Sequence, residues 1–309
     1  MTKWTAADIP DQSGRIAVVT GANSGLGLVT SRELARAGAR VILTSRDRAR
    51  GEGALRVIGE AVPGADVELR LLDLSSLASV QEFAEGLGSS YDAIDLLVNN
   101  AGVMAIPRQE TVDGFERQFA TNHLGHFALT GRLLPLLVAR AGSRVVTVSS
   151  NAHRGGKIDF DDLQRQRSYG RWRTYSATKL ANLLFTYELQ RRLAAAGAAT
   201  ISVAAHPGTS STNLTNVTAG GNPVKRVVLT LGVRVTGQSD EMGALPQLYA
   251  ATMPDVQGGQ FWGPDGRGGN KGYPTLVRST DRSHDEVAAR QLWQASVDLT
   301  GVGYDVLAA

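Results

Sequence analysis

The chain has 309 residues, and its 42% hydrophobic and 20% charged residues are usual for a soluble globular protein with a substantial core. The 32 basic residues exceed the 29 acidic ones by a net charge of only +3, which is too small to indicate a nucleic-acid partner. The absence of cysteine excludes disulfides and thiolate metal sites. Because no signal-peptide pattern and no apolar run of about 18 residues is present, we expect a cytoplasmic protein without a membrane span.

Short apolar runs rich in β-branched residues alternate with helical patterns along the chain. Strands are expected at 16–20, 41–44, 67–72, 96–98, 145–148, 201–205 and 259–262. Helices are expected at 24–37, 48–61, 77–87, 114–139, 175–196 and 284–299. The strands are continuous apolar runs, which indicates burial on both faces and therefore a parallel sheet with helices on either side.

No repeat or linker divides the sequence. We therefore expect residues 1–309 to form a single α/β domain, a doubly wound parallel sheet of the Rossmann type. Two stretches, 151–174 and 208–240, read as loops, the second with a short helix around 224–231. The first contains basic residues interleaved with Tyr169 and Trp172, a composition that can bind single-stranded nucleic acid, but a solvated loop is the simpler interpretation. The basic residues are Arg165, Arg167, Arg171 and Arg173.

Glycines mark the junction between the first strand and the first helix, in Thr-Gly-Ala-Asn-Ser-Gly-Leu-Gly at 20–27. Glycine lets the backbone turn tightly and approach a pyrophosphate, and the helix N-terminus supplies unpaired N–H groups. The residue after Gly27 is Leu28 rather than a lysine, which excludes the phosphate loop of nucleotide hydrolases. The pattern predicts a dinucleotide site, with a simple turn as the alternative.

The spacing of Gly21, Gly25 and Gly27 resembles that of the short-chain dehydrogenase/reductase family. The likeness extends from about 14 to 262 and includes four further motifs in the family's order. They are Asn-Asn-Ala-Gly at 99–102, Ser-Ser at 149–150, Tyr-Ser-Ala-Thr-Lys at 175–179 and Pro-Gly at 207–208. Residues 148–153 and 179–182 resemble the retinol-dehydrogenase-like branch, with some likeness to protochlorophyllide reductases. Unlike many retinol dehydrogenases, the chain is expected to have no N-terminal membrane anchor.

Tyr175 and Lys179 are four residues apart, so both project from one face of a helix. A tyrosine with a pKa near 10 is a poor acid–base catalyst at neutral pH, and a neighbouring ammonium lowers that pKa. We therefore expect Tyr175 to exchange the proton with the substrate oxygen. A surface pair is the alternative.

Three more polar residues are candidates for catalysis or its support. Ser150 follows the fifth strand and can donate to the substrate oxygen. Ser149 competes with it, because neighbouring strand residues face opposite ways, and the family pattern favours the second serine. By resemblance Asn122 holds a water that links Lys179 to solvent, whereas a buried amide could simply satisfy a backbone carbonyl. His123 and His126 are expected to be structural, and no metal site is expected.

The end of the second strand predicts the cofactor. NAD enzymes usually carry a carboxylate there for the ribose 2′-hydroxyl, but this chain has Ser45 and Arg46. A guanidinium suits a 2′-phosphate, so we expect NADP (NADPH); a solvated charge at a turn is the alternative.

Further cofactor contacts follow from the resemblance alone. It assigns adenine contacts to Asp73 and Leu74, ribose contacts to Asn99 and Lys179, and carboxamide contacts to the 207–212 loop. The expected cofactor-binding residues are Gly21, Asn23, Ser24, Gly25, Leu26, Gly27, Ser45, Arg46, Asp73, Leu74, Asn99, Ala101, Gly102, Tyr175, Lys179, Pro207, Gly208, Ser210 and Thr212.

These features predict an NADP-dependent oxidoreductase that moves hydride between nicotinamide and a carbonyl or alcohol carbon. The rival hypothesis is a dinucleotide sensor without turnover, which would need none of Ser150, Tyr175 and Lys179.

The two long loops bear on the substrate. Segment 151–174 lies between Ser150 and Tyr175, so we expect a substrate-side insert, and we expect 209–240 to form a lid whose apolar helix face excludes water. The alternative is that this face packs on the domain. The retinol-dehydrogenase-like resemblance implies a lipophilic substrate, whereas Arg171 and Arg173 could pair with an anionic one. The family resemblance also allows a homo-oligomer, in which two copies of the chain pair through 114–139 and 175–196.

Overall fold

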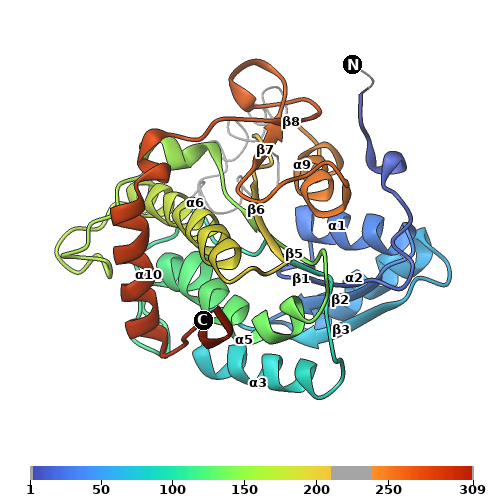
Figure 1. Cartoon of the computed structure of the whole chain (residues 1–309), viewed down its shortest axis with the longest axis horizontal. Helices are drawn as coiled ribbons and strands as arrows, with labels where there is room; N and C mark the ends of the chain where they lie inside the picture. Colours follow the sequence, from blue (N-terminus) through green and yellow to red (C-terminus); the bar gives the residue numbers. More distant parts are fainter. Residues whose placement is uncertain (1–2, 210–237, 308–309) are drawn as a thin grey trace, which may run out of the picture.

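The computed structural model describes residues 3–209 and 238–307. Its eight-stranded sheet has the strand order β3-β2-β1-β4-β5-β6-β7-β8 (Figure 1). All neighbouring strands are parallel except β7 and β8, which pair antiparallel. The strands are β1 Ile16–Val19, β2 Arg40–Ser45, β3 Val67–Leu71, β4 Leu96–Asn99, β5 Arg144–Val148, β6 Ile201–Ala205, β7 Phe261–Pro264 and β8 Pro274–Leu276.

Helices cover both faces of the sheet (Figure 1). One side carries α3 Leu77–Gly88, α5 Gly125–Val138 and α6 Arg171–Ala195, with α10 Glu286–Thr300 packed outside α6. The other side carries α1 Gly25–Arg36, α2 Arg48–Ala61 and α9 Asp240–Thr252. Shorter helical segments are η1 Ala6–Asp8, α4 Arg117–Phe119, η2 Ala120–Leu124, η3 Asn151–Gly155, η4 Arg267–Gly269, η5 Asp281–His284 and η6 Asp305–Leu307.

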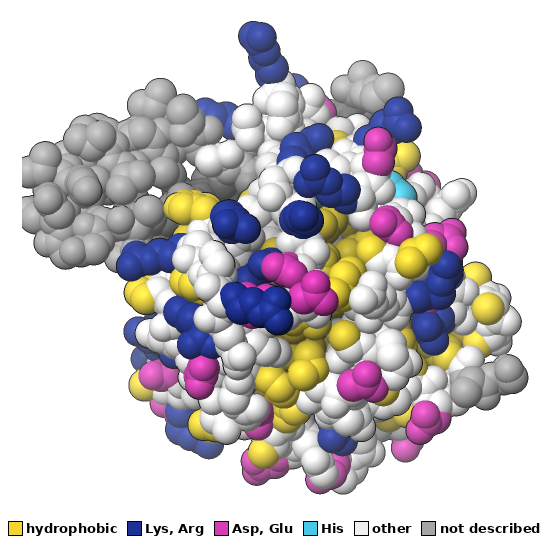
Figure 2. Space-filling model, turned by 90° about the vertical axis from the view of Figure 1, so that its left-hand side faces the viewer, with side chains coloured by type: hydrophobic (Ala, Val, Ile, Leu, Met, Phe, Trp, Pro, Cys, Tyr) yellow, Lys and Arg dark blue, Asp and Glu magenta, His cyan; other side chains and the backbone are white. Residues whose placement is uncertain are grey.

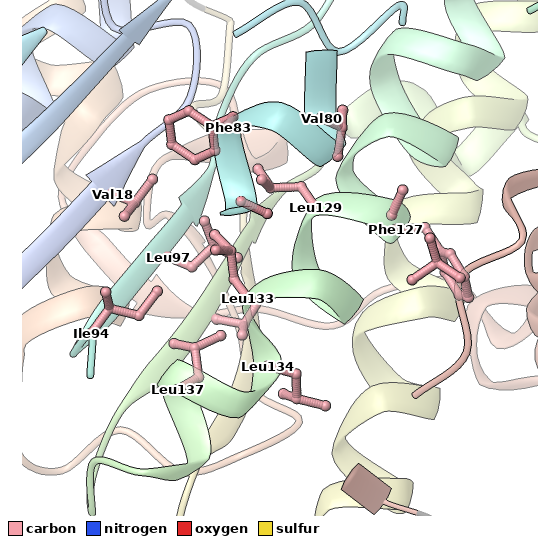
Figure 3. Packing of buried hydrophobic residues seen from close by; sticks show 14 of the residues in the cluster. Val18, Val80, Phe83, Ile94, Leu97, Phe127, Leu129, Leu133, Leu134 and Leu137 are labelled. Carbon is pink, nitrogen blue, oxygen red and sulfur yellow. The ribbon is translucent and has the colours of Figure 1, made fainter. Parts of the chain in front are cut away.

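Successive residues of the central strands feed two separate cores. Ala17 and Val19 of β1 pack with α1 and α2, whereas Val18 between them packs with α3 and α5. Figure 3 shows Val18 and Leu97 on the second side, facing Leu129 and Leu133 of α5. Burial on both faces explains why β1 is apolar at every position and why the polar residues of β2, β4 and β5 stand at or near the strand ends. The predicted doubly wound Rossmann-type fold is confirmed.

The order of the strands identifies the edge of the sheet at which a ligand would bind. From β1 the chain proceeds outward to β2 and β3, and then returns to β4 on the other side of β1. In an open parallel sheet, ligands bind at the carboxyl ends of the strands where the order reverses in this way. The glycine turn after β1, residues 99–102 after β4, Ser150 after β5 and Pro207 after β6 all lie at such strand ends.

Several elements differ from the sequence-based expectation. The helix expected at 114–139 is divided into α4, a π-helical turn at η2, and α5. Segment 151–174 begins with η3, and its last four residues form the first turn of α6. Helix α9 and strand β8 were not predicted, although Ser239 followed by acidic residues is a recognisable helix start: its hydroxyl accepts from the backbone N–H of Met242.

The C-terminal segment lies against α5 and α6, the helices through which two copies of the chain are expected to pair. Trp293 of α10 stacks on Phe185 of α6 with ring centroids 5.9 Å apart. The Tyr304 hydroxyl donates to the Phe127 carbonyl of α5 at 2.7 Å. Part of the outer face of α5 and α6 is thus occupied within the same chain, and a homo-oligomer stays a prediction.

Two helical glycines make the packing of α5 testable. A Cβ on Gly125 would collide with the Leu74 carbonyl, whereas one on Gly59 of α2 would meet nothing within 4 Å. We expect Gly125→Ala to destabilise the fold by about 1–3 kcal/mol, the usual range for overpacking. Gly59→Ala should stabilise it by about 0.5–1 kcal/mol, because alanine has the higher helix propensity. Urea unfolding of both variants measures the difference, and equal midpoints would contradict this account of the α5 packing.

Candidate active site

The glycine turn is shaped by close backbone approach. Gly21 has a φ of +63° and Gly25 one of +57°, a region that favours glycine. A Cβ on Gly21 would lie only 2.8 Å from that of Ala101, and one on Gly27 would lie 2.6 Å from the Gly21 carbonyl oxygen. Helix α1 follows with Ser24 as its N-cap, and the Ser24 side chain makes no capping hydrogen bond. The turn is therefore a cradle with free helix N–H groups, which fits a dinucleotide pyrophosphate.

Arg46 lies two residues beyond the point where β2 meets this turn. The Ala22 N–H donates to the Thr44 carbonyl at 3.0 Å, which ties the two strand ends together. Arg46 is exposed and, within the described ranges, forms no hydrogen bond or ion pair. By contrast, the Ser45 hydroxyl donates to the Asp47 carbonyl, and the Asp47 carboxylate caps α2 through the Arg50 N–H. Arg46 is thus a free cation beside the turn, and Asp47 is already engaged.

The loop after β4 carries two asparagines with opposite orientations. Asn99 is 1% exposed and its amide donates to the Thr130 hydroxyl at 3.0 Å, so its side chain points into the interior. A ribose contact by Asn99 would therefore have to come from its backbone. Asn100 instead donates to the Thr20 carbonyl at 2.8 Å. Gly102 leaves space beside the site, because a Cβ there would lie 3.6 Å from the Lys179 ammonium.

The remaining predicted contacts are only partly described. One Asp73 carboxylate oxygen accepts from the Ser75 N–H at 2.9 Å, and Leu74 is buried. Gly208 has a φ of +66°, and Gln238 donates to the Pro207 carbonyl at 2.7 Å. Ser210, Thr212 and most of the predicted lid lie outside the described residues.

Tyr175 and Ser150 meet at the carboxyl end of β5. The Ser150 hydroxyl is close enough to that of Tyr175 to lower the pKa of the tyrosine, and it also accepts from the Ala152 N–H at 3.2 Å. Ser149 instead donates to the Lys179 carbonyl at 2.8 Å and is buried, so of the two serines Ser150 faces the tyrosine. Burial raises the pKa of Tyr175 and outweighs the opposite effect of the Ser150 hydroxyl. The spacing of Tyr175 and Lys179 had predicted a lowered pKa.

The Lys179 ammonium explains this difference. It is buried, and it donates to the Val148 carbonyl at 3.0 Å rather than to the tyrosine hydroxyl. The Nζ atom of Lys179 lies 5.8 Å from the centroid of the Tyr175 ring. Burial lowers the pKa of Lys179 to about 8, because a charged amine is poorly solvated here.

Asn122 lies in the π-helical turn and is fully buried. Its amide oxygen accepts from the Val103 N–H at 2.8 Å, and its amide nitrogen donates to the Val103 carbonyl and the Thr178 hydroxyl, both at 2.9 Å. The side chain therefore joins η2 to the loop after β4 and to α6: both of its N–H groups are used, and its oxygen accepts one of the two hydrogen bonds that it can accept. A water held by Asn122 stays a prediction.

A cavity of about 550 Å³ lies beside Ser150. Its lining includes Asn151, Arg154, His206, Val277 and Arg278. The predicted insert thus contributes its first residues to the cavity wall. Farther along, Arg165 pairs with Asp159 and the Tyr169 hydroxyl donates to the Ile106 carbonyl, so that part packs on the domain.

Trp172 is a neighbour of the site that sequence reasoning missed. It is 48% exposed, and its ring meets that of Tyr175 edge to face with centroids 6.1 Å apart. The signal was present in the sequence, because residues three apart lie on one helix face.

The side of the molecule on which α10 lies shows Lys and Arg side chains scattered among acidic and apolar ones (Figure 2).

Residues 3–209 and 238–307 contain neither a metal-binding cluster nor a membrane-spanning helix. No group of three or more His, Asp or Glu side chains in these ranges could hold a metal ion. No helix in them is long and apolar enough to cross a membrane.

Comparison with solved structures extends the resemblance to the whole fold. An uncharacterised protein from Mycobacterium paratuberculosis is 47% identical with a TM-score of 0.82, covering 98% of this chain and 99% of that one. The Pseudomonas aeruginosa RhlG/NADP active-site complex is 25% identical with a TM-score of 0.64, covering 81% of this chain and 94% of that one.

Comparison with known sequences gives the family. Mouse retinol dehydrogenase 14 and human retinol dehydrogenase 13 are each 42% identical over 94% of this chain, covering 86% and 85% of their own lengths. The model of the short chain dehydrogenase family matches residues 15–221. The chain therefore belongs to the short chain dehydrogenase family, whose members are oxidoreductases acting on alcohols and carbonyl compounds.

Proposed function

We propose that the protein is an NADP-dependent oxidoreductase in which Tyr175 is the acid–base catalyst and the substrate is a lipophilic carbonyl compound or alcohol. The observation that carries this proposal is that Ser150 faces the hydroxyl of Tyr175, with the buried Lys179 one helical turn away. A dinucleotide sensor would need no such pair.

Tyr175, Ser150 and Lys179 have different roles at the substrate oxygen. The hydroxyl of Tyr175 gives up its proton in carbonyl reduction and takes one in alcohol oxidation, and the hydroxyl of Ser150 binds the same oxygen. The raised pKa keeps Tyr175 protonated at neutral pH, which is the form that reduction requires. Lys179 adds positive charge beside the tyrosine when it is protonated.

The glycine turn and Arg46 would hold the cofactor. Bound NADPH supplies the hydride in reduction, and NADP accepts it in oxidation. The turn offers free N–H groups to the pyrophosphate, and the unpaired Arg46 suits the 2′-phosphate. Ser45 does not compete for this role, because its hydroxyl is engaged within the turn. The NADP complex of a 25% identical structure supports the same cofactor here.

The surroundings of Tyr175 favour an apolar substrate. Trp172 exposes an aromatic ring next to the tyrosine, and Pro264 and Val277 line the neighbouring cavity. Arg154 and Arg278 line it too, and they would favour an anionic group. The apolar groups lie closer to the reacting oxygen, because Trp172 contacts the Tyr175 ring, whereas Tyr175 does not line the cavity that holds the arginines.

Removing the Tyr175 hydroxyl tests the catalytic role. In Tyr175→Phe we expect kcat to fall by about 10²–10⁴, the usual scale for loss of general acid–base catalysis, with the Kd for NADPH nearly unchanged. Nicotinamide absorbance on a panel of carbonyl compounds gives kcat, and fluorescence titration gives the Kd. Tyr304→Phe, which removes a buried hydroxyl bonded to the Phe127 carbonyl, is the control and should keep native turnover. Near-native turnover of Tyr175→Phe would refute the mechanism.

Arg46 tests the choice of cofactor. A charge-assisted hydrogen bond to the 2′-phosphate contributes about 1.5–3 kcal/mol, so we expect the enzyme to prefer NADP over NAD by roughly tenfold to hundredfold. Arg46→Ala should largely abolish this preference by raising the KM for NADP while that for NAD stays constant. Arg56→Ala, on the exposed side of α2, is the matched control. Equal KM values for NAD and NADP in the native protein would show that Arg46 is only a solvated charge.

A substrate series tests the apolar surroundings. We expect kcat/KM to rise with chain length across aliphatic and aromatic ketones, and to be lower for carboxylate analogues of the same size. Trp172→Ala should flatten the rise by removing apolar surface next to Tyr175. A clear preference for the carboxylates, lost in Arg278→Gln, would instead identify the substrate as anionic.

A further inference from the structure

The buried histidine His126 lies close to the candidate site and has no role in the chemistry proposed above. The ring of His126, in the first turn of α5, is 1% exposed. Its Nε2 lies 2.9 Å from the Thr20 hydroxyl, and its Nδ1 lies 3.2 Å from the Asn122 backbone carbonyl. The ring thus joins the residue before the glycine turn to the π-helical turn that carries Asn122.

The partners of the ring determine its tautomer. The Asn122 carbonyl oxygen can only accept, so Nδ1 of His126 carries the proton. Burial and the charge of Lys179 lower the pKa of His126 to about 4, so the ring is neutral at physiological pH. Nε2 is therefore an acceptor, and the Thr20 hydroxyl must donate to it.

Donation to His126 orients the hydroxyl of Thr20. With its proton directed at Nε2, the oxygen has two lone pairs left, and they accept the N–H groups of Asn100 and Ala101, each at 2.9 Å. Both residues pack against the glycine turn, Ala101 at Gly21 and the Asn100 side chain at Gly27. All the hydrogen-bonding capacity of one hydroxyl is used, and its orientation depends on the imidazole.

We propose that His126 is a positioning residue that joins the three backbone segments of the dinucleotide site. As the neutral Nδ1–H tautomer it fixes the Thr20 hydroxyl, which holds residues 100–101 against the glycine turn, and it fixes the turn that carries Asn122. The inference rests on the proposed function in one respect, because two of these segments, the glycine turn and residues 100–101, are expected to hold NADPH.

The chemistry of the ring explains why other residues would not serve. A protonated imidazole would donate from Nε2 and turn the Thr20 hydroxyl away, so that one of the two N–H groups would lose its acceptor. It would also add a second positive charge near Lys179. The Val98 carbonyl also accepts from the Thr20 hydroxyl, at the longer distance of 3.3 Å, and with an apolar side chain in place of His126 the hydroxyl proton would turn to it.

His123 offers a matched comparison within the same helical stretch. It is 2% exposed, its Nε2 bonds to the Ser296 hydroxyl at 2.9 Å, and its ring stacks on Phe119 with centroids 5.3 Å apart. These contacts join η2 to α10 and do not involve the glycine turn. Substituting His123 removes an equally buried imidazole without touching the dinucleotide site.

The test compares His126→Leu with His123→Leu in the full-length protein. Three quantities are measured: hydrogen exchange of the peptide that contains Asn100 and Ala101, the Kd for NADPH by fluorescence, and the free energy of unfolding in urea. We expect both variants to lose stability. Only His126→Leu should speed exchange at Asn100 and Ala101, by about tenfold or more, and weaken NADPH binding by a similar factor, because a local opening then exposes these N–H groups.

Thr20 variants test the link itself. Thr20→Val should reproduce both effects of His126→Leu, and Thr20→Ser, which keeps the hydroxyl, should restore near-native exchange. Since the two residues act through one hydrogen bond, the double variant Thr20→Val/His126→Leu should be no worse than either single one. A purely structural role of His126 would instead make the two losses add.

Each outcome has a distinct meaning. If His126→Leu leaves exchange and the NADPH Kd within about twofold of His123→Leu, or if the double variant is additive, the positioning role is wrong. If the native protein does not bind NADPH but exchange at Asn100 and Ala101 still depends on His126, the proposed function fails and the positioning role stands. Should His126→Leu not fold, His126→Gln against His123→Gln makes the same comparison with a polar group retained.

Discussion

The contact between the backbone after β1 and the backbone after β4 is the constraint on which the candidate site depends. The two strands are neighbours in the sheet, and the residues that follow them approach until a Cβ on Gly21 would lie 2.8 Å from that of Ala101. Thr20 bridges the same gap with one hydroxyl. The glycine turn, the residues after β4 and Ser150 after β5 thus follow three neighbouring strands of the sheet at the same edge.

Burial governs the electrostatics of this region. Desolvation is the largest cause of the pKa shifts of Tyr175, Lys179 and His126, and each shift favours the neutral form. A neutral His126 can accept from Thr20, and a neutral Tyr175 can donate a proton. Lys179 differs because its pKa of about 8 leaves it largely charged at neutral pH, with the Val148 carbonyl as its partner. The core that stabilises the fold therefore also sets the protonation states of the site.

Local patterns were enough to predict most of the fold. Apolar β-branched runs and helical periodicity depend on near neighbours in sequence, and the bounds of α2 and β6 came out as expected. The π-helical turn within the helix expected at 114–139 was not predicted. It ends where Gly125 approaches the Leu74 carbonyl, a contact between segments that are distant in sequence. Strand β8 is three residues long and forms only by pairing with β7, so its sequence carried no signal of its own.

For the candidate site, the sequence by itself determined which residue types stand at the strand ends and at what spacing, because motif and strand end are local features. Tertiary contacts decided where those side chains point. Ser150 rather than Ser149 faces Tyr175, and the Asn99 side chain turns inward to Thr130. His123 and His126 look equivalent in sequence, yet one bonds to α10 and the other to Thr20. The direction of a polar side chain is set by the partner it finds across the fold, and that partner is distant in sequence.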